Sequence, residues 1–176
     1  GDEDPYLRHG AIMGLDGCGS LEQLVDLRSD TDRAVRIAAV VALRRRGSPE
    51  LTRFLSDPDP LVVEEAARAI HDLPIAEALP ELAKILPRTP LTEPTQFRAL
   101  NALNRQGDSE AARQIALFAA RGDAPETLRL EAVGMLGTWE HPESRDRVNG
   151  DWMPLAARSN SELAGIVRPV LPALLV

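Results

Sequence analysis

The stretch Asp59-Pro-Leu-Val-Val-Glu-Glu-Ala-Ala-Arg-Ala-Ile70 decides the fold, because variants of it recur along the chain. Each copy has a small residue four positions before a bulky one, which places the two on one face of a helix. The five pairs are Ala11/Leu15, Ala39/Leu43, Ala66/Ile70, Ala99/Leu103 and Ala132/Leu136. Their alanines recur at intervals of 28, 27, 33 and 33 residues. A self-similar period of about 30 residues predicts a stacked array of repeats.

Each period is predicted to hold a first helix with this pattern, a break, and a shorter second helix. Asp4-Pro5 and Asp59-Pro60 are favourable helix starts, because Asp caps a helix and Pro is tolerated at its first position. The first helix around Val35 to Leu43 is apolar nearly all round, which predicts burial between neighbouring helices. Gly10 and Gly14 each cost about 1 kcal/mol relative to alanine in a helix, so we expect a neighbouring helix to approach them closely.

The repeat pattern fails at residues 137–159, after the fifth first helix. So long a gap is usually functional or hides a short helix, for which 142–148 is the candidate range. Two interpretations remain open for this segment. Its two tryptophans fill a gap in the repeat stack, or the segment is a docking surface for a protein partner, since Trp and Arg dominate binding hot spots. The candidate docking residues are Trp139, His141, Arg145, Arg147 and Trp152. Beyond the segment, Ser161 is expected to cap a last amphipathic helix kinked at prolines.

Composition narrows the class of partner. The net charge of −7 repels a phosphate backbone, so a nucleic acid is disfavoured. The run Arg44-Arg45-Arg46 is expected to close a helix, where cations complement the helix dipole. No apolar run approaches the ~20 residues that span a bilayer. Cys18 is the single cysteine, which excludes an internal disulfide and a cysteine-pair metal or haem motif.

No catalytic constellation is visible in the sequence. His9, His71 and His141 fall in separate repeats without a second ligand at metal spacing. No glycine-rich phosphate loop follows a predicted strand. We therefore predict no catalytic, cofactor-binding or metal-binding residues.

Helix pairs at this period, with the recurring pattern Asp-Pro-x-x-Val/Leu-Arg-x-x-Ala, resemble short HEAT repeats over almost the whole chain. The segments 42–50, 57–70 and 145–152 together also resemble the helical-repeat region of large bacterial exported dehydrogenases. In that family a sorbosone/glucose-dehydrogenase-like β-propeller precedes the repeats and a c-type haem domain follows. The resemblance implies an exported or periplasmic redox parent, in which this fragment serves as a spacer or docking part.

The fold prediction is all-α, a right-handed α-α superhelix (a HEAT/armadillo-like solenoid) of about five helix pairs. It covers residues 1–176 as one solenoid, excised from a larger multidomain protein. The predicted function is a non-catalytic protein–protein interaction or scaffold module, with a protein as its partner. One alternative is an accessory protein of lyase type that binds a small cofactor in its groove, with Arg53, Lys84 and Arg113 as scattered candidates. Another is self-association through the apolar end 170–176.

Overall fold

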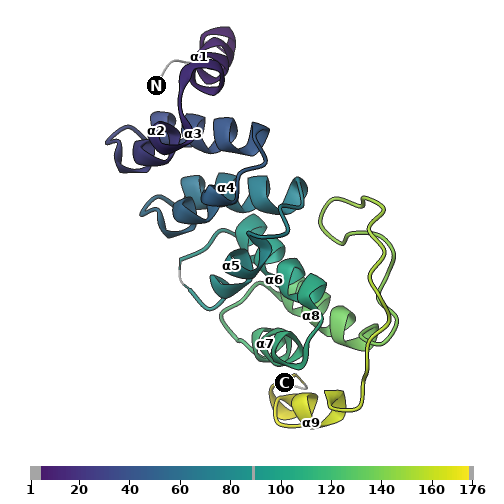
Figure 1. Ribbon diagram of the computed structural model, residues 1–176. Coiled ribbons are helices and arrows are strands. Elements are labelled where there is room, and N and C mark those ends of the chain that lie inside the picture. Colours follow the sequence, from purple (N-terminus) through teal and green to yellow (C-terminus); the bar gives the residue numbers. More distant parts are fainter. Residues whose placement is uncertain (1–4, 89, 175–176) are drawn as a thin grey trace. The chain divides into compact units, whose positions relative to one another are not determined.

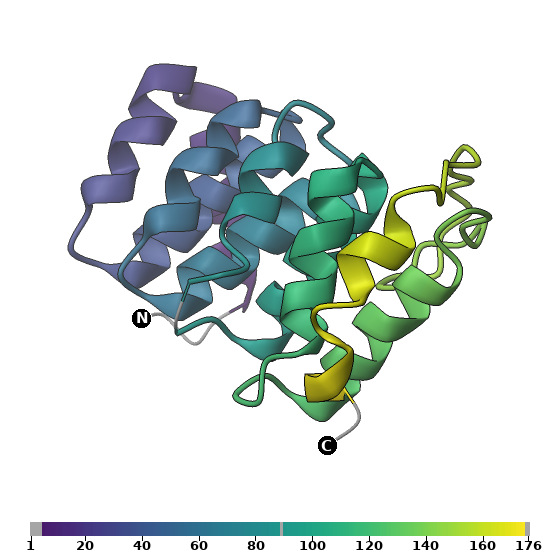
Figure 2. The same cartoon turned by 90° about the horizontal axis from the view of Figure 1, so that it is seen from below.

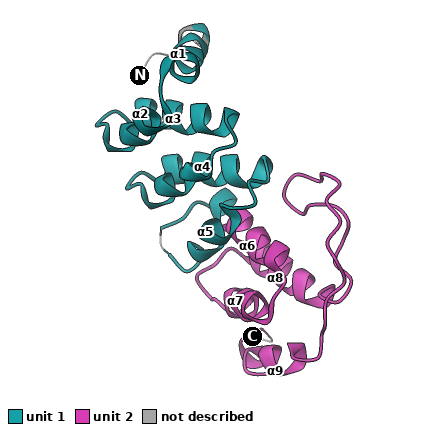
Figure 3. Cartoon of the chain, viewed as in Figure 1, with its two compact units in different colours: residues 1–95 teal, residues 96–176 magenta. Residues whose placement is uncertain are grey.

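The computed structural model describes residues 5–88 and 90–174, and these form helices with no strand apart from one isolated bridge. This confirms the prediction of an all-α helical-repeat fold. The chain divides into two compact units, residues 1–95 and residues 96–176 (Figure 3). Each unit is a stack of helices.

In unit 1 the helices alternate between longer first helices and shorter second helices (Figure 1). In chain order they are α1 (Pro5–Cys18), α2 (Leu21–Asp26), η1 (Leu27–Ser29), α3 (Arg33–Arg45), η2 (Pro49–Ser56), α4 (Pro60–Asp72) and α5 (Leu79–Lys84). The second helix η2 is a 3-10 helix of 8 residues, and the second helix α5 is an α-helix of 6 residues. Prolines sit in the first turn of both, and a missing N–H is tolerated only there.

Aspartates begin the two central helices of unit 1. The carboxylate of Asp32 accepts a hydrogen bond from the backbone N–H of Ala34 at 2.8 Å, and Asp59 accepts one from Leu61 at 2.9 Å. Each bond satisfies one of the backbone donors that a helix start leaves unpaired. The cap predicted at Asp4 lies outside the described residues.

The core of unit 1 forms where α3 contacts α1 and α4, and where α4 contacts η2. No residue from Val35 to Arg44 is exposed, which confirms that α3 is buried between neighbours. Ala39 and Ala66 are both fully buried. Residues with a small side chain at these positions let the helix axes approach each other, as stacked repeats require.

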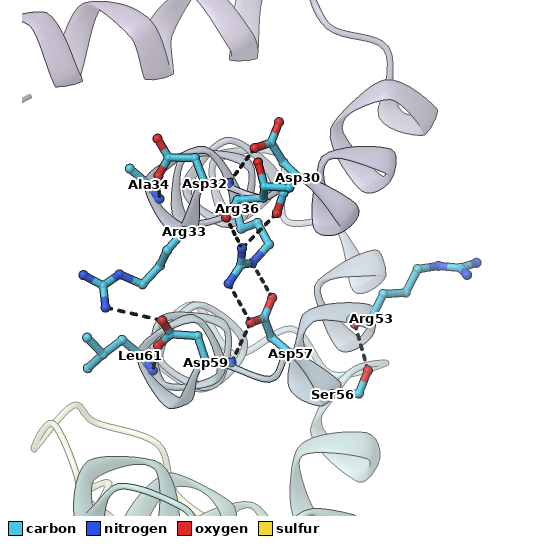
Figure 4. A network of polar contacts seen from close by, with 11 residues as sticks. Asp30, Asp32, Arg33, Ala34, Arg36, Arg53, Ser56, Asp57, Asp59 and Leu61 are labelled. Atoms are coloured by element: carbon cyan, nitrogen blue, oxygen red, sulfur yellow. Dashed lines mark hydrogen bonds and ion pairs between the residues drawn. The ribbon is translucent and has the colours of Figure 1, made fainter. Parts of the chain in front are cut away.

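An ion pair joins the first helices of two consecutive repeats within unit 1 (Figure 4). The guanidinium of Arg36 on α3 donates to both carboxylate oxygens of Asp57, at 2.8 and 3.2 Å. It also donates to the backbone oxygen of Asp30 at 2.8 Å. Asp57 in turn accepts from the N–H of Asp59, the residue that caps α4. The bidentate pair therefore ties α3 to the start of the next repeat.

Helix α1 departs from the expectation. Ala11 is exposed, and a β-carbon added at Gly10 or Gly14 would meet no atom within 4 Å. The expected close approach of a neighbour to these glycines is wrong, because α3 contacts α1 without covering this face.

In unit 2 the helices are α7 (Ser109–Ala119), α8 (Glu126–Gly137), α9 (Leu163–Val167) and α10 (Leu171–Leu174), preceded by α6 (Glu93–Gln106), of which residues 96–106 belong to this unit. Helix α7 contacts both α8 and α9 (Figure 2). Ala99 and Ala132 are fully buried, as the repeat pattern predicts.

Residues 138–162 separate α8 from α9 and contain no helix. The helix considered for 142–148 is therefore wrong, since bends and a turn occupy that range. Ser161 does not cap α9 either. The capping position is Glu162, whose side chain makes no capping hydrogen bond. In unit 2, α8 and α9 thus stand as a first and a second helix with a long irregular insertion between them.

Candidate functional site

The insertion between α8 and α9 folds into a hairpin, here defined as residues 140–158. Three backbone hydrogen bonds join its legs: Arg158 to Glu140 at 3.0 Å, Met153 to Ser144 at 2.8 Å, and Asp146 to Asp151 at 2.8 Å. In each bond the first residue donates its N–H. The legs leave the helices of unit 2 side by side and meet in a turn at residues 146–150 (Figure 1). Gly150 closes the turn with φ of 77°, in the left-handed region that favours glycine.

The carboxylate of Asp146 anchors the hairpin to α6. One carboxylate oxygen, Oδ2, accepts from the amide of Asn101 and from the guanidinium of Arg105, both at 2.6 Å. The other, Oδ1, accepts from the backbone N–H groups of Val148 and Asn149 at 2.9 and 3.0 Å. The side chains of Asp146 and Arg105 are 2% and 6% exposed. One buried carboxylate thus holds the turn of the hairpin and fixes that turn to a helix.

The base of the hairpin is held by a second set of contacts. The guanidinium of Arg158 lies over the ring of Trp139 at 4.5 Å from its centroid. It also donates to the side-chain oxygen of Asn104 at 3.2 Å. Burial lowers the pKa of Arg158 below its ordinary value. A desolvated guanidinium stacked on an indole is a strong form of the cation–π interaction.

The two tryptophans differ in exposure. Trp139 is 4% exposed and packs inside unit 2, so it lines no outer surface. Trp152 is 69% exposed on the second leg of the hairpin, in an antiparallel bridge with Arg145. Fully exposed tryptophans are unusual in globular proteins, because the side chain is large and mainly apolar.

The other three candidate docking residues also differ in their exposure and their contacts. Arg145 is exposed and donates to the backbone oxygen of Gly150 at 2.9 Å, which leaves its side chain at the surface of the hairpin. Arg147 instead donates to Glu131 on α8 and to Glu143, each at 2.9 Å, and its side chain is 14% exposed. His141 is exposed near the base of the hairpin. The structure therefore brings Arg145 and Trp152 together at the surface and uses Arg147 as an internal anchor.

Four residues that hold the hairpin were not found from the sequence. Asn101, Asn104 and Arg105 fall at positions i, i+3 and i+4 of α6, and all three contact the hairpin. The spacing of three polar residues along one face of a helix was the available signal. Arg158 gave none, because it lies in an irregular stretch.

The cations considered for a small cofactor each have a carboxylate partner on their own helix. Arg53, Lys84 and Arg113 lie on η2, α5 and α7, and each forms an ion pair with the glutamate three residues earlier on its own helix. Arg113 also borders a groove of about 620 Å³ in unit 2, together with Leu117 of α7 and Ser161, Glu162, Gly165, Ile166, Pro169 and Val170. The groove is mostly apolar and holds one cation and one carboxylate.

Two features are absent from residues 5–88 and 90–174. No group of three or more His, Cys, Asp or Glu side chains in these ranges is arranged to hold a metal ion. Over the same ranges, no helix is both long and apolar enough to cross a membrane.

Residues 1–55 match a family model described as HEAT repeats. This range covers α1, α2, η1, α3 and most of η2, which are the first two helix pairs of unit 1. No curated protein matches the chain. HEAT repeats are commonly modules for protein–protein interaction or scaffolding.

Proposed function

We propose that this chain is a non-catalytic protein-interaction module and that its docking element is the hairpin, with Trp152 as the main anchor. The observation that carries the proposal is the exposure of Trp152, 69%, on a hairpin held to the helices by buried contacts. Tryptophan is enriched among the few residues that supply most binding energy in protein interfaces.

The hairpin meets a second requirement of a docking element, because it is ordered before a partner arrives. Ordering a flexible loop on binding costs part of the interaction free energy. Three hydrogen bonds between the legs and the buried Asp146 carboxylate already fix this loop. Insertions within helical repeats also frequently form the binding face of such proteins.

The charge of the hairpin and of the whole chain indicates the chemistry of the partner. Arg145 pairs with Trp152 in an antiparallel backbone bridge across the hairpin, and both residues are exposed. The chain as a whole carries a net charge of −7, which favours a protein partner with basic or mixed charge over a nucleic acid.

The test compares Trp152→Ala with Leu130→Ala, since Leu130 is an apolar residue of α8 that is 64% exposed in the same unit. Proteins that the unsubstituted chain captures from the source organism are identified and purified. The affinity of each purified protein for the chain is then measured by calorimetry. We expect Trp152→Ala to weaken binding by about tenfold or more, the loss of at least about 1.4 kcal/mol that hot spots show, and Leu130→Ala to leave it unchanged. Equal affinity for Trp152→Ala and the parent chain contradicts the proposal, and a collapse of the melting temperature in that variant makes Trp152 structural instead.

The resemblance to exported dehydrogenases supports a more specific setting, in which the module is the docking or spacer part of a redox protein with a c-type haem domain. The full-length parent, produced in a host that matures c-type haem, is then expected to show a Soret band and a covalent haem mass increment. A colourless parent without that increment contradicts this setting and leaves the interaction module standing.

The groove between α7 and α9 favours one alternative, an accessory protein that binds a small cofactor. Its volume of about 620 Å³ lies within the usual range for small-molecule sites. The structure supports this function less, because Arg113 is neutralised by Glu110 and no further cation joins it in the groove. Arg113→Ala is expected to abolish cofactor retention if this alternative holds, and to change nothing if the hairpin is the functional element.

A further inference from the structure

We infer that Asp146 is the positioning residue of the docking hairpin: its carboxylate sets where Trp152 is displayed, without touching a partner itself. The inference rests on the proposed function for its biological meaning. The held conformation itself can be measured with no partner present.

The two carboxylate oxygens of Asp146 accept from different parts of unit 2. Oδ1 accepts from two backbone N–H groups of the turn, at Val148 and Asn149. Oδ2 accepts from two side chains of α6, at Asn101 and Arg105. The turn and the helix are therefore joined through one carboxylate group, and the Asp146 N–H extends the connection to Asp151, the residue before Trp152, at 2.8 Å.

A carboxylate is the one side-chain group of this size that can fill both roles. An ionised Asp has only acceptors, whereas Asn has one acceptor oxygen and one donor NH₂ group. The new amide in Asp146→Asn has two orientations. If its oxygen faces the turn, its NH₂ group faces the donors of Asn101 and Arg105, and no hydrogen bond forms between them. The flipped amide keeps those two partners and loses the bonds to the turn. Either way one of the two connections breaks, although the shape of the side chain barely changes.

The remaining contacts of the outer half of the hairpin are weaker than the lost connection. Arg147 pairs with Glu131 and Glu143, whose side chains are 39% and 56% exposed, so solvent screens both pairs. Arg158 and Trp139 hold the base of the hairpin, at the opposite end from the turn. We therefore expect loss of the Asp146 carboxylate to release the outer half of the hairpin, including Trp152, while the helices of unit 2 keep their packing.

The chain has two tryptophans, and this makes the test direct. Labelling with 5-fluorotryptophan gives one ¹⁹F resonance for each, and Trp152→Phe assigns them. In Asp146→Asn we expect the Trp152 resonance to shift and narrow toward that of a mobile side chain, and the Trp139 resonance to stay in place. Hydrogen exchange at the turn amides should accelerate by about tenfold or more, since the flipped amide loses the bonds to the turn and an amide oxygen kept there is a weaker acceptor than the carboxylate.

Asp151→Asn is the matched control, because it makes the same chemical change in the same hairpin at an exposed side chain. Neither resonance should move in this variant. If Asp146→Asn does not fold, Asn101→Ala supplies the second variant: it removes one donor, keeps the ion pair with Arg105, and should shift the Trp152 resonance by a smaller amount in the same direction. An unchanged Trp152 resonance in the folded variant overturns the inference, whatever the partner experiments show. Loss of binding on Trp152→Ala together with that outcome would leave the proposed function intact.

Discussion

Arg36 and Asp57 form a bidentate ion pair between two consecutive repeats, with side chains 10% and 2% exposed. The same aspartate also accepts from the N–H of Asp59, and Asp59 caps α4. One carboxylate thus joins two repeats and also holds the residue that caps α4 (Figure 4). The Asp30 carboxylate likewise accepts from the N–H of Asp32, the cap of α3, at 2.8 Å, but Asp30 contacts Arg36 through its backbone oxygen.

Removal of the Asp57 carboxylate should destabilise unit 1 strongly. Asp57→Ala leaves the Arg36 guanidinium in a buried position without its counter-charge, and breaking a buried pair in this way typically costs about 3–5 kcal/mol. Urea denaturation followed by circular dichroism measures the loss. Glu50→Ala is the control, since it breaks a pair with Arg53 whose side chains are 50% and 34% exposed and should cost no more than about 1 kcal/mol. Similar losses in the two variants would show that burial does not set the strength of the Arg36 pair.

Gly107 should tolerate substitution less well than Gly47, although both follow a helix with positive φ, 71° and 60°. Alanine in the left-handed region costs roughly 1–2 kcal/mol, and this cost applies to both positions. A β-carbon at Gly107 would also lie 2.6 Å from Nε of Arg158, whereas one at Gly47 meets nothing within 4 Å. Overpacking of this kind adds about 1–3 kcal/mol.

Denaturation of the two variants isolates this difference, because the backbone strain cancels in the comparison. Fluorescence of Trp139 gives a second readout, since Arg158 lies over its ring. Equal destabilisation of Gly47→Ala and Gly107→Ala would mean that Arg158 moves aside without cost.

The repeat pattern in the sequence predicted the buried faces well where a neighbouring helix covers them. Ala39, Ala66, Ala99 and Ala132 are all fully buried, because a small residue at period 3.6 marks the face on which helices meet. Ala11 fits the same pattern and is exposed. A pattern marks the face that can be buried, and it does not say whether a neighbour is present.

The sequence predicted the position of the candidate site, but not the exposure of its residues or their contacts. The break after Gly137 placed it, but Trp139 and Trp152 have opposite exposures that depend on the path of an irregular chain. The role of Asp146 depends on Asn101 and Arg105, which lie 45 and 41 positions earlier. No local propensity encodes a pairing over that distance, so only the folded chain shows it.

Substitution of the α1 glycines should stabilise the protein. A β-carbon at Gly10 or Gly14 meets no atom within 4 Å, and alanine is better than glycine in a helix by about 0.8–1.0 kcal/mol. Gly10→Ala and Gly14→Ala should each raise the melting temperature, and the double variant should raise it further. A lower melting temperature would show that another chain segment packs against this face of α1, as the sequence pattern first suggested.

Asp16 should make the stability of unit 1 depend on pH in the acidic range. Hydrogen bonds from the guanidinium groups of Arg45 and Arg46 lower the pKa of Asp16 below its ordinary value of 3.8. A carboxylate whose pKa is lower in the folded chain than in the unfolded chain stabilises the fold above the unfolded value, and this contribution disappears as the pH falls through the folded value. The parent chain should therefore be more stable than Asp16→Asn at pH 7, and the two should converge at a pH below both pKa values.

The control for this measurement is Asp26→Asn, since Asp26 is an exposed aspartate of α2 in the same unit. Its stability should follow that of the parent chain at both pH values, apart from small effects on the surface charge. Salt gives a second check, because the Asp16 carboxylate and both arginines are partly exposed and their attraction is screened. The difference between the parent chain and Asp16→Asn at pH 7 should shrink as the salt concentration rises. Equal stability of the two chains at pH 7 would instead assign the contact to the backbone oxygen of residue 16, which both chains keep and which accepts from Arg46.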